Sequence, residues 1–232
     1  IMVFLTFFSR AVRIGATFLF GSTGETLTEK SGHLNLGIPG IMCVGAVGGC
    51  FGVSLYMGSL SSPDAANPFL AVLIPLLMSI LFSICMGVIY SFLTVTLRSN
   101  QNVTGLALTT FGVGFTNFFI NTIDVSRFNA ASSHFTNYMP IADKLGWFGK
   151  MFLSYGILVY LAIAIALIAA WFLKKTKIGL HLRAVGENPA TADAAGINVT
   201  SYRYITTCIG SAIAGLGGLC FIMDNMNGNW EY

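Results

Sequence analysis

Charged residues are scarce in this sequence. The 232 residues include 12 Lys+Arg and 9 Asp+Glu, which is 9 % of the chain, against about 25 % in a soluble domain. So few charges cannot cover a globular surface, and a hydrophobic fraction of 55 % excludes a disordered chain. The net charge of +3 is too small for a nucleic-acid surface, so no nucleic-acid partner is expected. The remaining class is an integral membrane protein with several spans.

The motifs of several enzyme classes are also absent. The chain has no GxxxxGK[ST] loop to cradle phosphates, no HExxH and no GxSxG, so we expect a protein that is not an enzyme and binds no cofactor of its own. The cysteines form no CxxC pair and lie in apolar runs, which predicts small apolar core residues: Cys43, Cys50, Cys85, Cys208 and Cys220. The histidines are expected in separate loops, solvated or capping, so no metal site is predicted: His33, His134 and His181.

Long apolar runs dominate the chain instead. A span needs about 20 mostly apolar residues, and the first candidate is interrupted by Arg10 and Arg13. An uncharged third run exceeds one membrane thickness, so we expect it to tilt, to extend past the bilayer, or to bend near Pro75 or Gly87. The prediction is an all-α polytopic transmembrane helical bundle, a single domain over 1–232, with about six segments: 1–22, 36–60, 69–97, 103–122, 152–173 and 204–223.

Basic residues predict the orientation of the spans. The loop 174–203 is the most basic, so the positive-inside rule places it in the cytoplasm. Counting back through single spans puts these cations inside: Lys30, Arg98, Lys174, Lys175, Lys177, Arg183 and Arg203. It puts these outside: Arg127, Lys144 and Lys150. The Gly-rich stretch 36–60 contains Pro39 and leaves a re-entrant helix open, which would change the parity of the N-terminal part.

Small residues recur at intervals of four in two of the spans. Such pairs let a neighbouring helix backbone approach closely. We therefore expect tight helix contacts at Gly45–Gly49, Gly48–Gly52, Ser211–Gly215 and Ala214–Gly218.

The basic loop 174–203 contains a complete set of helix start and stop signals. Asn188 suits an N-cap, Pro189 the first helical position, and Gly196 a C′ residue with positive φ. Ala190–Ala195 between them is a helix-forming run with a smooth surface. The pattern predicts a short capped helix outside the membrane, which either docks into a groove on a partner or is an ordinary surface helix.

Three stretches resemble one family of membrane proteins. GLHLRAVGENPATADAAGINV resembles the cytoplasmic loop of ATP-binding-cassette (ABC) importer permeases, in the branch that serves simple sugars, nucleosides and branched-chain amino acids. LTEKSGHLNLGIPGIMCVGA resembles the N-terminal signature of that branch and SNQNVTGLALTTFGVG its central one. The three occur in the family's order and spacing, and the combination is most similar to the nucleoside and simple-sugar permeases.

The resemblance implies a subunit of a larger machine. A pair of permeases, identical or related, would form the pathway in a bacterial plasma (inner) membrane, a separate ATPase pair would use ATP and Mg²⁺, and an external binding protein would deliver the solute. It also gives the capped helix the role of a coupling helix in the ATPase groove, formed by Glu187, Asn188, Pro189, Ala190, Thr191, Ala192, Asp193, Ala194, Ala195 and Gly196. ATP-driven closure would then move this helix and switch the permease between outward- and inward-facing states.

Two features depart from the family pattern. Pro39 stands where the family usually has an acidic residue. The family also continues beyond the helix expected to end near Met223, so C-terminal spans are expected to be missing from this chain, which would make it a fragment or a truncated version.

Polar and aromatic residues in or near two spans are candidates for the solute path. Polar side chains are costly inside a membrane and tend to face cavities or other helices. Asn117 and Asn121 share a helix face, and Phe111 and Phe115 can stack on a nucleobase or sugar, although packing alone can also explain each residue. The predicted lining is Asn35, Gly37, Gly40, Thr104, Thr109, Phe111, Phe115, Asn117 and Asn121.

A nucleoside is the first expectation for the solute, and a pentose or hexose is the second. Two other functions stay open. An ion-coupled secondary carrier would need an ion site within the membrane, and the scarcity of charge in the better spans argues against it. A non-transporting membrane scaffold would use the capped helix for docking alone.

Overall fold

The structure, a computed structural model, describes residues 2–60, 67–121, 123, 128–136 and 146–230. These ranges contain helices and no strand, which confirms the predicted all-α class. The helices are α1 (Met2–Lys30), α2 (Ile38–Gly58), α3 (Pro68–Ser91), α4 (Gln101–Ile120), α5 (Phe128–Thr136), α6 (Gly146–Phe152), α7 (Ile157–Lys175), α8 (Lys177–Glu187), α9 (Pro189–Ala194) and α10 (Val199–Cys220). Two π-helical turns continue α3 and α10, η2 (Phe92–Thr96) and η5 (Phe221–Asn225). Much of the predicted outer loops 61–68 and 123–151, with Arg127 and Lys144, lies outside the described residues.

Five helices are long and apolar enough to cross a membrane: α2, α3 with η2, α4, α7, and α10 with η5. Each coincides with a predicted span apart from shifts at its ends. The first predicted span, 1–22, lies within α1, which is not one of these five. Its predicted end is wrong, because α1 continues for 29 residues to Lys30 and packs along α10 and α7.

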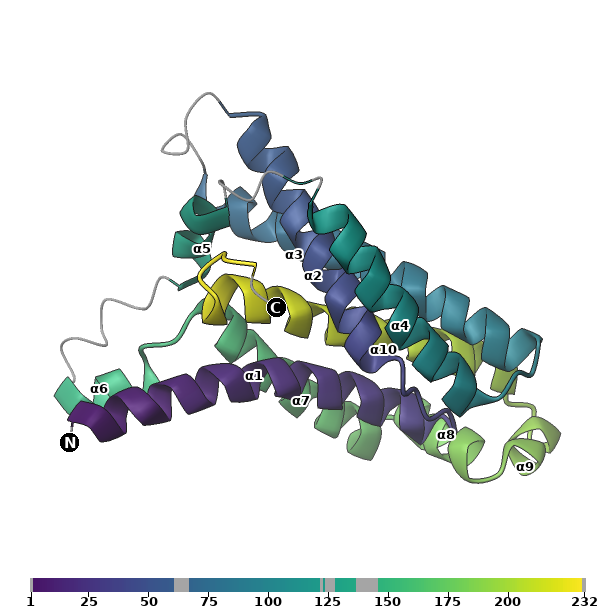
Figure 1. Cartoon of the computed structure of the whole chain (residues 1–232). Helices are drawn as coiled ribbons and strands as arrows, with labels where there is room; N and C mark the ends of the chain where they lie inside the picture. Colours follow the sequence, from purple (N-terminus) through teal and green to yellow (C-terminus); the bar gives the residue numbers. More distant parts are fainter. Residues whose placement is uncertain (1, 61–66, 122, 124–127, 137–145, 231–232) are drawn as a thin grey trace.

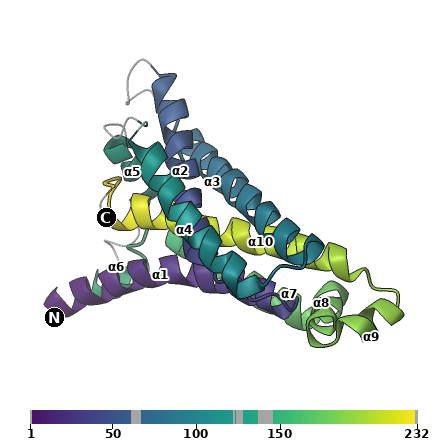
Figure 2. The same cartoon turned by 45° about the vertical axis from the view of Figure 1, so that its right-hand side comes forward.

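Helix α10 is the centre of the bundle. It packs against α1, α2 and α3, while α4 packs against α2 and α7 packs against α1. Figures 1 and 2 show α1 and α7 diverging from α2, α3 and α4 toward the end that carries α5. The buried share of the apolar stretch differs between the five helices. It is 67 % in each of α2 and α10, 28 % in each of α3 and α7, and 33 % in α4. The outer three helices therefore leave most of their surface to lipid or to other subunits.

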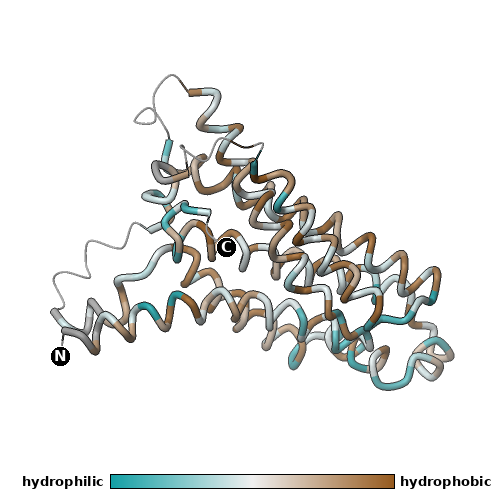
Figure 3. The backbone as a smooth tube through the Cα atoms, in the orientation of Figure 1, coloured by the Kyte–Doolittle hydropathy of each residue, from teal (hydrophilic) through white to brown (hydrophobic). Residues whose placement is uncertain are grey.

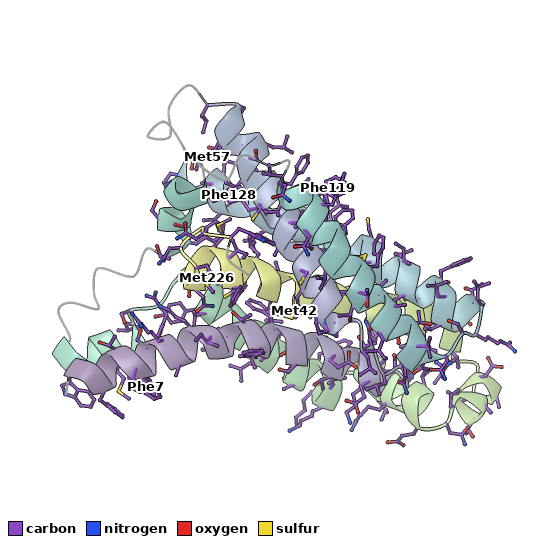
Figure 4. The ribbon with its side chains drawn as sticks, in the orientation of Figure 1. Phe7, Met42, Met57, Phe119, Phe128 and Met226 are labelled. Carbon is purple, nitrogen blue, oxygen red and sulfur yellow. The ribbon has the colours of Figure 1, made fainter. Side chains whose placement is uncertain are left out.

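Glycine at the predicted positions makes the central contacts possible. A Cβ on Gly45 would lie 2.5 Å from the Cα of Gly215 and 2.6 Å from the Oγ of Ser83. A Cβ on Gly218 would overlap the carbonyl oxygen of Met42, which Figure 4 labels on α2. Real side chains cannot occupy these spaces, so the backbones of α2 and α10 touch directly. The predicted tight helix contacts are confirmed.

The three connections predicted to face the cytoplasm gather at one end of the bundle. Gly186 at the end of α8 lies against Lys30, since a Cβ there would overlap the Lys30 carbonyl. The Oε1 of Gln101, at the start of α4, accepts a hydrogen bond from the backbone N–H of Leu34 at 3.0 Å. Figure 3 shows hydrophilic residues concentrated around α8 and α9 at this end. The predicted topology places these three connections on the same side of the membrane, which agrees with this arrangement.

Both proline-containing central spans are continuous helices. Pro39 occupies the first turn of α2, where its missing N–H has no helical partner, so it does not break the helix. Pro75 lies inside α3, and the helix continues past it and past Gly87 before η2. With η2, this span is 29 residues long, about 43 Å at 1.5 Å per residue, which exceeds a hydrocarbon core of about 30 Å as expected.

Several expectations about loops are wrong. Helix α8 was expected as loop, although Thr176 caps it by accepting from the N–H of Gly179 at 3.0 Å. His134 lies on α5 and His181 on α8, where its Nδ1 contacts the Tyr202 hydroxyl at 3.1 Å. Among the cysteines, Cys50 and Cys220 are buried as predicted, but Cys85 is exposed on α3.

Candidate functional site

The short helix α9 ends as the sequence predicts at both termini. The Oδ1 of Asn188 accepts from the N–H of Thr191 at 3.1 Å, and Pro189 fills the first turn. Gly196 has φ +81°, and its N–H donates to the carbonyl of Asp193 at 2.8 Å. The N–H of Ile197 donates to the carbonyl of Ala192 at 3.0 Å. These paired bonds form a Schellman motif, which satisfies the last carbonyls of the helix.

Helix α9 presents small side chains to the outside. The side chain of Ala192 is buried within the protein, whereas Ala190, Thr191, Asp193 and Ala194 are exposed. Glu187, which the resemblance includes in the coupling helix, instead ends α8, and a break at Asn188 separates the two helices. The structure therefore offers a smooth ridge of one and a half turns at the basic end of the bundle.

The segment 31–37 between α1 and α2 is irregular, with turns at both ends, and is held by side chains from three helices. The Oε1 of Glu25 on α1 accepts from the N–H of Asn35 at 2.8 Å. The hydroxyl of Tyr90 on α3 donates to the carbonyl of Leu34 at 2.8 Å, and Thr109 on α4 donates to the carbonyl of Leu36 at 2.9 Å. Irregular backbone near a membrane needs such partners. The N-terminal signature thus has a structural function at the meeting point of α1, α3 and α4.

His33 lies inside this segment and is 1 % exposed, so the expectation of a solvated or capping histidine is wrong. Its Nδ1 has no hydrogen-bond partner among the described residues. Burial, helped by the charge of Arg203, lowers the pKa of His33 to about 4. The imidazole is therefore neutral when the protein is folded.

Acid should destabilise the protein through His33. The folded state disfavours the charged imidazole, so its contribution to stability is complete above the unfolded pKa of 6.5 and is lost as pH falls toward about 4. Between pH 7.5 and 5.5, we expect the free energy of unfolding of wild type to fall by about 1.4 kcal/mol more than that of the His33→Gln variant. Thermal unfolding of both proteins in detergent between pH 7.5 and 5 measures this difference. Glu25 and Arg203 are present in both, and parallel pH profiles would contradict the prediction.

Five residues predicted to line the solute path lie in the contact between α2, α4 and segment 31–37. The side chain of Asn35 is 1 % exposed, and its Oδ1 accepts from the N–H of Gly37 at 2.9 Å. A Cβ on Gly40 would lie 2.6 Å from the Cα of Thr109. The hydroxyl of Thr104 pairs with that of Ser99 at 2.9 Å. These contacts explain why these residue types occur here without invoking a solute.

The other four predicted residues lie further along α4. Phe111 is 55 % exposed, and Phe115 is half-buried with its ring centroid 6.0 Å from that of Phe111. Asn117 is half-buried and Asn121 is exposed, with the Nδ2 of Asn121 bonded to the Asn117 carbonyl at 2.9 Å. Phe119, at 4.4 Å from Phe115, extends the aromatic row toward the end of α4 that is far from α9 (Figure 4). The rings and the amides therefore lie on the same stretch of chain, in which Phe111 and Asn121 are exposed.

A buried acidic residue was missed by the sequence analysis. Asp224 lies in the π-helical turn η5, is 1 % exposed, and neither carboxylate oxygen has a hydrogen-bond partner among the described residues. Arg13 on α1 interacts with it electrostatically. Asn225 also links η5 to α1, because its Nδ2 donates to the Oγ1 of Thr17 at 3.0 Å. The available signals were Asp224 itself, which follows the apolar run ending at Met223, and Arg13 within another apolar run.

The fold and these sites define a multi-pass helical membrane protein with a capped, exposed helix at its basic end. The chain belongs to the family of branched-chain amino acid transport system permease components, whose model matches residues 7–231. No solved structure matches the chain.

Several relatives of the chain are named as nucleoside or sugar permeases. The chain is 32 % identical to the guanosine ABC transporter permease protein NupQ of Bacillus subtilis, over 88 % of this chain and 62 % of the relative. It is 31 % identical to the nucleoside ABC transporter permease protein NupC of Lactococcus lactis, over 92 % and 65 %. It is 31 % identical to the putative glucose ABC transporter permease protein TsgC13 of Haloferax volcanii, over 89 % and 59 %. The chain therefore spans about six-tenths of the length of these relatives.

Proposed function

We propose that this chain is the membrane-spanning part of an ABC importer subunit that moves a nucleoside or a simple sugar across a bacterial inner membrane. The observation that carries the proposal is α9, a helix of six residues with both ends capped, exposed small side chains and a basic setting. A rigid ridge of this kind suits docking into a groove of a separate ATPase, which would bind ATP and Mg²⁺. The names of the relatives support the same conclusion.

Helix α8 offers a route for movement from α9 to the spans. Gly186 of α8 lies against Gly32, with 3.3 Å between the Cα of Gly186 and a Cβ placed on Gly32. The segment 31–37 is in turn bonded to α1, α3 and α4. A displacement of α9 would therefore act on several spans at one point. Such rigid-body transmission is a common basis of alternating access.

The exposed half of α4 is the proposed solute surface. The rings of Phe111 and Phe115 offer apolar faces, and the amides of Asn117 and Asn121 offer donors and acceptors suited to hydroxyl groups. Because α4 packs mainly on α2, its other side is open to a second permease subunit, identical or related. The solute would pass between the two and would arrive from an external binding protein.

Uptake measurements test the proposed function. Cells expressing the whole gene product with its ATPase and binding protein should accumulate labelled guanosine or glucose. Uptake should fail when the ATPase is inactivated and should persist when an uncoupler removes the proton gradient. Uptake that stops with the uncoupler would instead support an ion-coupled carrier, and uptake of neither solute class under any condition would support a scaffold.

Asn117→Ala should weaken solute binding without loss of folded protein. The Asn117 side chain makes no hydrogen bond to the described residues, so its removal leaves no protein group unpaired. Loss of one hydrogen bond to solute of about 1 kcal/mol should raise KM about fivefold. Thr110→Val is the control, because the Thr110 hydroxyl already donates to the Leu106 carbonyl of its own helix at 3.1 Å. Unchanged uptake kinetics in Asn117→Ala would remove this residue from the solute path.

A further inference from the structure

A groove of about 540 Å³ lies between α1 and α7, and none of its lining residues is on α9 or α4. Its walls are mostly apolar and its charged residues are all basic. The lining residues are Leu19, Ser22, Thr23, Thr26, Leu27 and Lys30 of α1, Ala166, Ala169, Ala170, Leu173 and Lys174 of α7, and Arg183 of α8.

The groove has one apolar end and one cationic end. Along α1 it extends from Leu19 to Lys30, about 16 Å at 1.5 Å per residue. The alanines of α7 form its wall within the membrane. Lys30 and Lys174 close α1 and α7 at the same end of the bundle, and Arg183 joins them from α8. An occupant must therefore combine an apolar chain with an anionic head.

The polar groups of the groove are suited to an anion. The hydroxyls of Ser22 and Thr26 already donate to carbonyls of their own helix, at 3.2 and 2.7 Å. Of the cations, Arg183 has its Nε buried without a hydrogen-bond partner among the described residues. The acidic residues of the same helices, Glu25, Glu29 and Glu187, are not part of the lining. Charge therefore favours a phosphate group at this end.

We infer that the groove binds one anionic phospholipid, with an acyl chain along the alanines of α7 and its phosphate between Lys30, Lys174 and Arg183. Basic pockets between transmembrane helices on the cytoplasmic side select anionic head groups in this way. A bound lipid would fill the space between α1 and α7, which adjoins α8. The site does not depend on which solute is transported.

Charge removal at the head-group site tests the inference. The purified whole gene product is incubated with phosphatidylglycerol or phosphatidylcholine, and bound lipid is measured by native mass spectrometry. The triple variant Lys30→Gln, Lys174→Gln, Arg183→Gln should bind phosphatidylglycerol about a hundredfold more weakly than wild type. The matched control removes three other cations that are exposed outside the groove: Arg98→Gln, Lys175→Gln and Lys177→Gln. It should bind as wild type does.

A size change tests the acyl-chain part independently of charge. Ala166→Phe fills the groove and should lower phosphatidylglycerol binding about tenfold, whereas Ala164→Phe on the exposed side of α7 should leave it unchanged. Soluble glycerophosphate should not compete, because it lacks the chain. Equal binding by the two triple variants, equal binding of the two lipids, displacement by glycerophosphate, or no lipid bound by wild type would overturn the inference.

Discussion

Gly218→Ala is expected to destroy most of the folded protein, although it adds a single methyl group. A Cβ at this position would overlap the carbonyl oxygen of Met42 and lie 2.7 Å from its carbonyl carbon. Backbone atoms cannot rotate away as a side chain can, so α2 and α10 would have to separate. These are the two most buried spans, and the cost should be about 3 kcal/mol or more.

Gly114→Ala is the matched control for this substitution. Gly114 is also in a membrane helix, and a Cβ there would meet no atom within 4 Å. Fluorescence-detected size-exclusion chromatography of both variants in detergent measures the monodisperse yield and its melting temperature. We expect wild-type values for Gly114→Ala and a lower melting temperature or an aggregated peak for Gly218→Ala. Wild-type behaviour of Gly218→Ala would show that the α2–α10 contact is looser than in this structure.

Gly196→Pro is expected to abolish ATPase recovery and uptake while the membrane bundle stays folded. Proline fixes φ near −65° and lacks an N–H, whereas Gly196 has φ +81° and donates to Asp193 at 2.8 Å. The end of α9 must therefore change, and the exposed ridge with it. A Cβ on Gly196 would meet no atom within 4 Å, so nothing in the bundle core is disturbed.

Gly196→Asn provides the control, since asparagine tolerates positive φ and keeps the N–H. Both variants and wild type are co-expressed as whole gene products with the ATPases of the same organism and purified by a tag on the permease. A second pair of variants tests the shape of the α9 surface without changing the end of the helix. Ala194→Trp adds a large side chain to the exposed ridge of α9, and its control, Ala164→Trp, adds one to the exposed side of α7. ATPase recovery should fall at least tenfold with Gly196→Pro and with Ala194→Trp. The two control variants, Gly196→Asn and Ala164→Trp, should recover as much ATPase as wild type. Full recovery with both would exclude α9 as the coupling surface.

Elements with strong local signals were predictable from the sequence. The spans follow from apolar length, the glycine contacts from spacing of four, and α9 from Asn188, Pro189 and Gly196, all properties of neighbouring residues. Helix α8 was not predicted, because it lies within a basic stretch that was assigned as a whole to a loop, although its buried residues Leu182 and Val185 are three apart on one helix face.

The candidate sites were predictable only in part. Residues within 35–40 and 104–109 were predicted to line the solute path, and the structure shows that these two stretches contact each other, as with Thr109 and the Leu36 carbonyl. The burial of His33 and Asp224 was missed. A polar residue in a loop or at a helix end is ordinarily solvated, and burial there depends on which distant helices cover it.

The sequence by itself determined that this is an all-helical membrane protein with close helix contacts and a capped helix at a basic end. These properties depend on hydropathy, residue size and hydrogen bonds between neighbours, which act locally. Only the tertiary structure decided that α10 is central, that segment 31–37 joins three helices, that Asp224 is buried, and that three cations line one groove. Each of these brings together residues far apart in the chain, and their pairing is set by how whole helices pack.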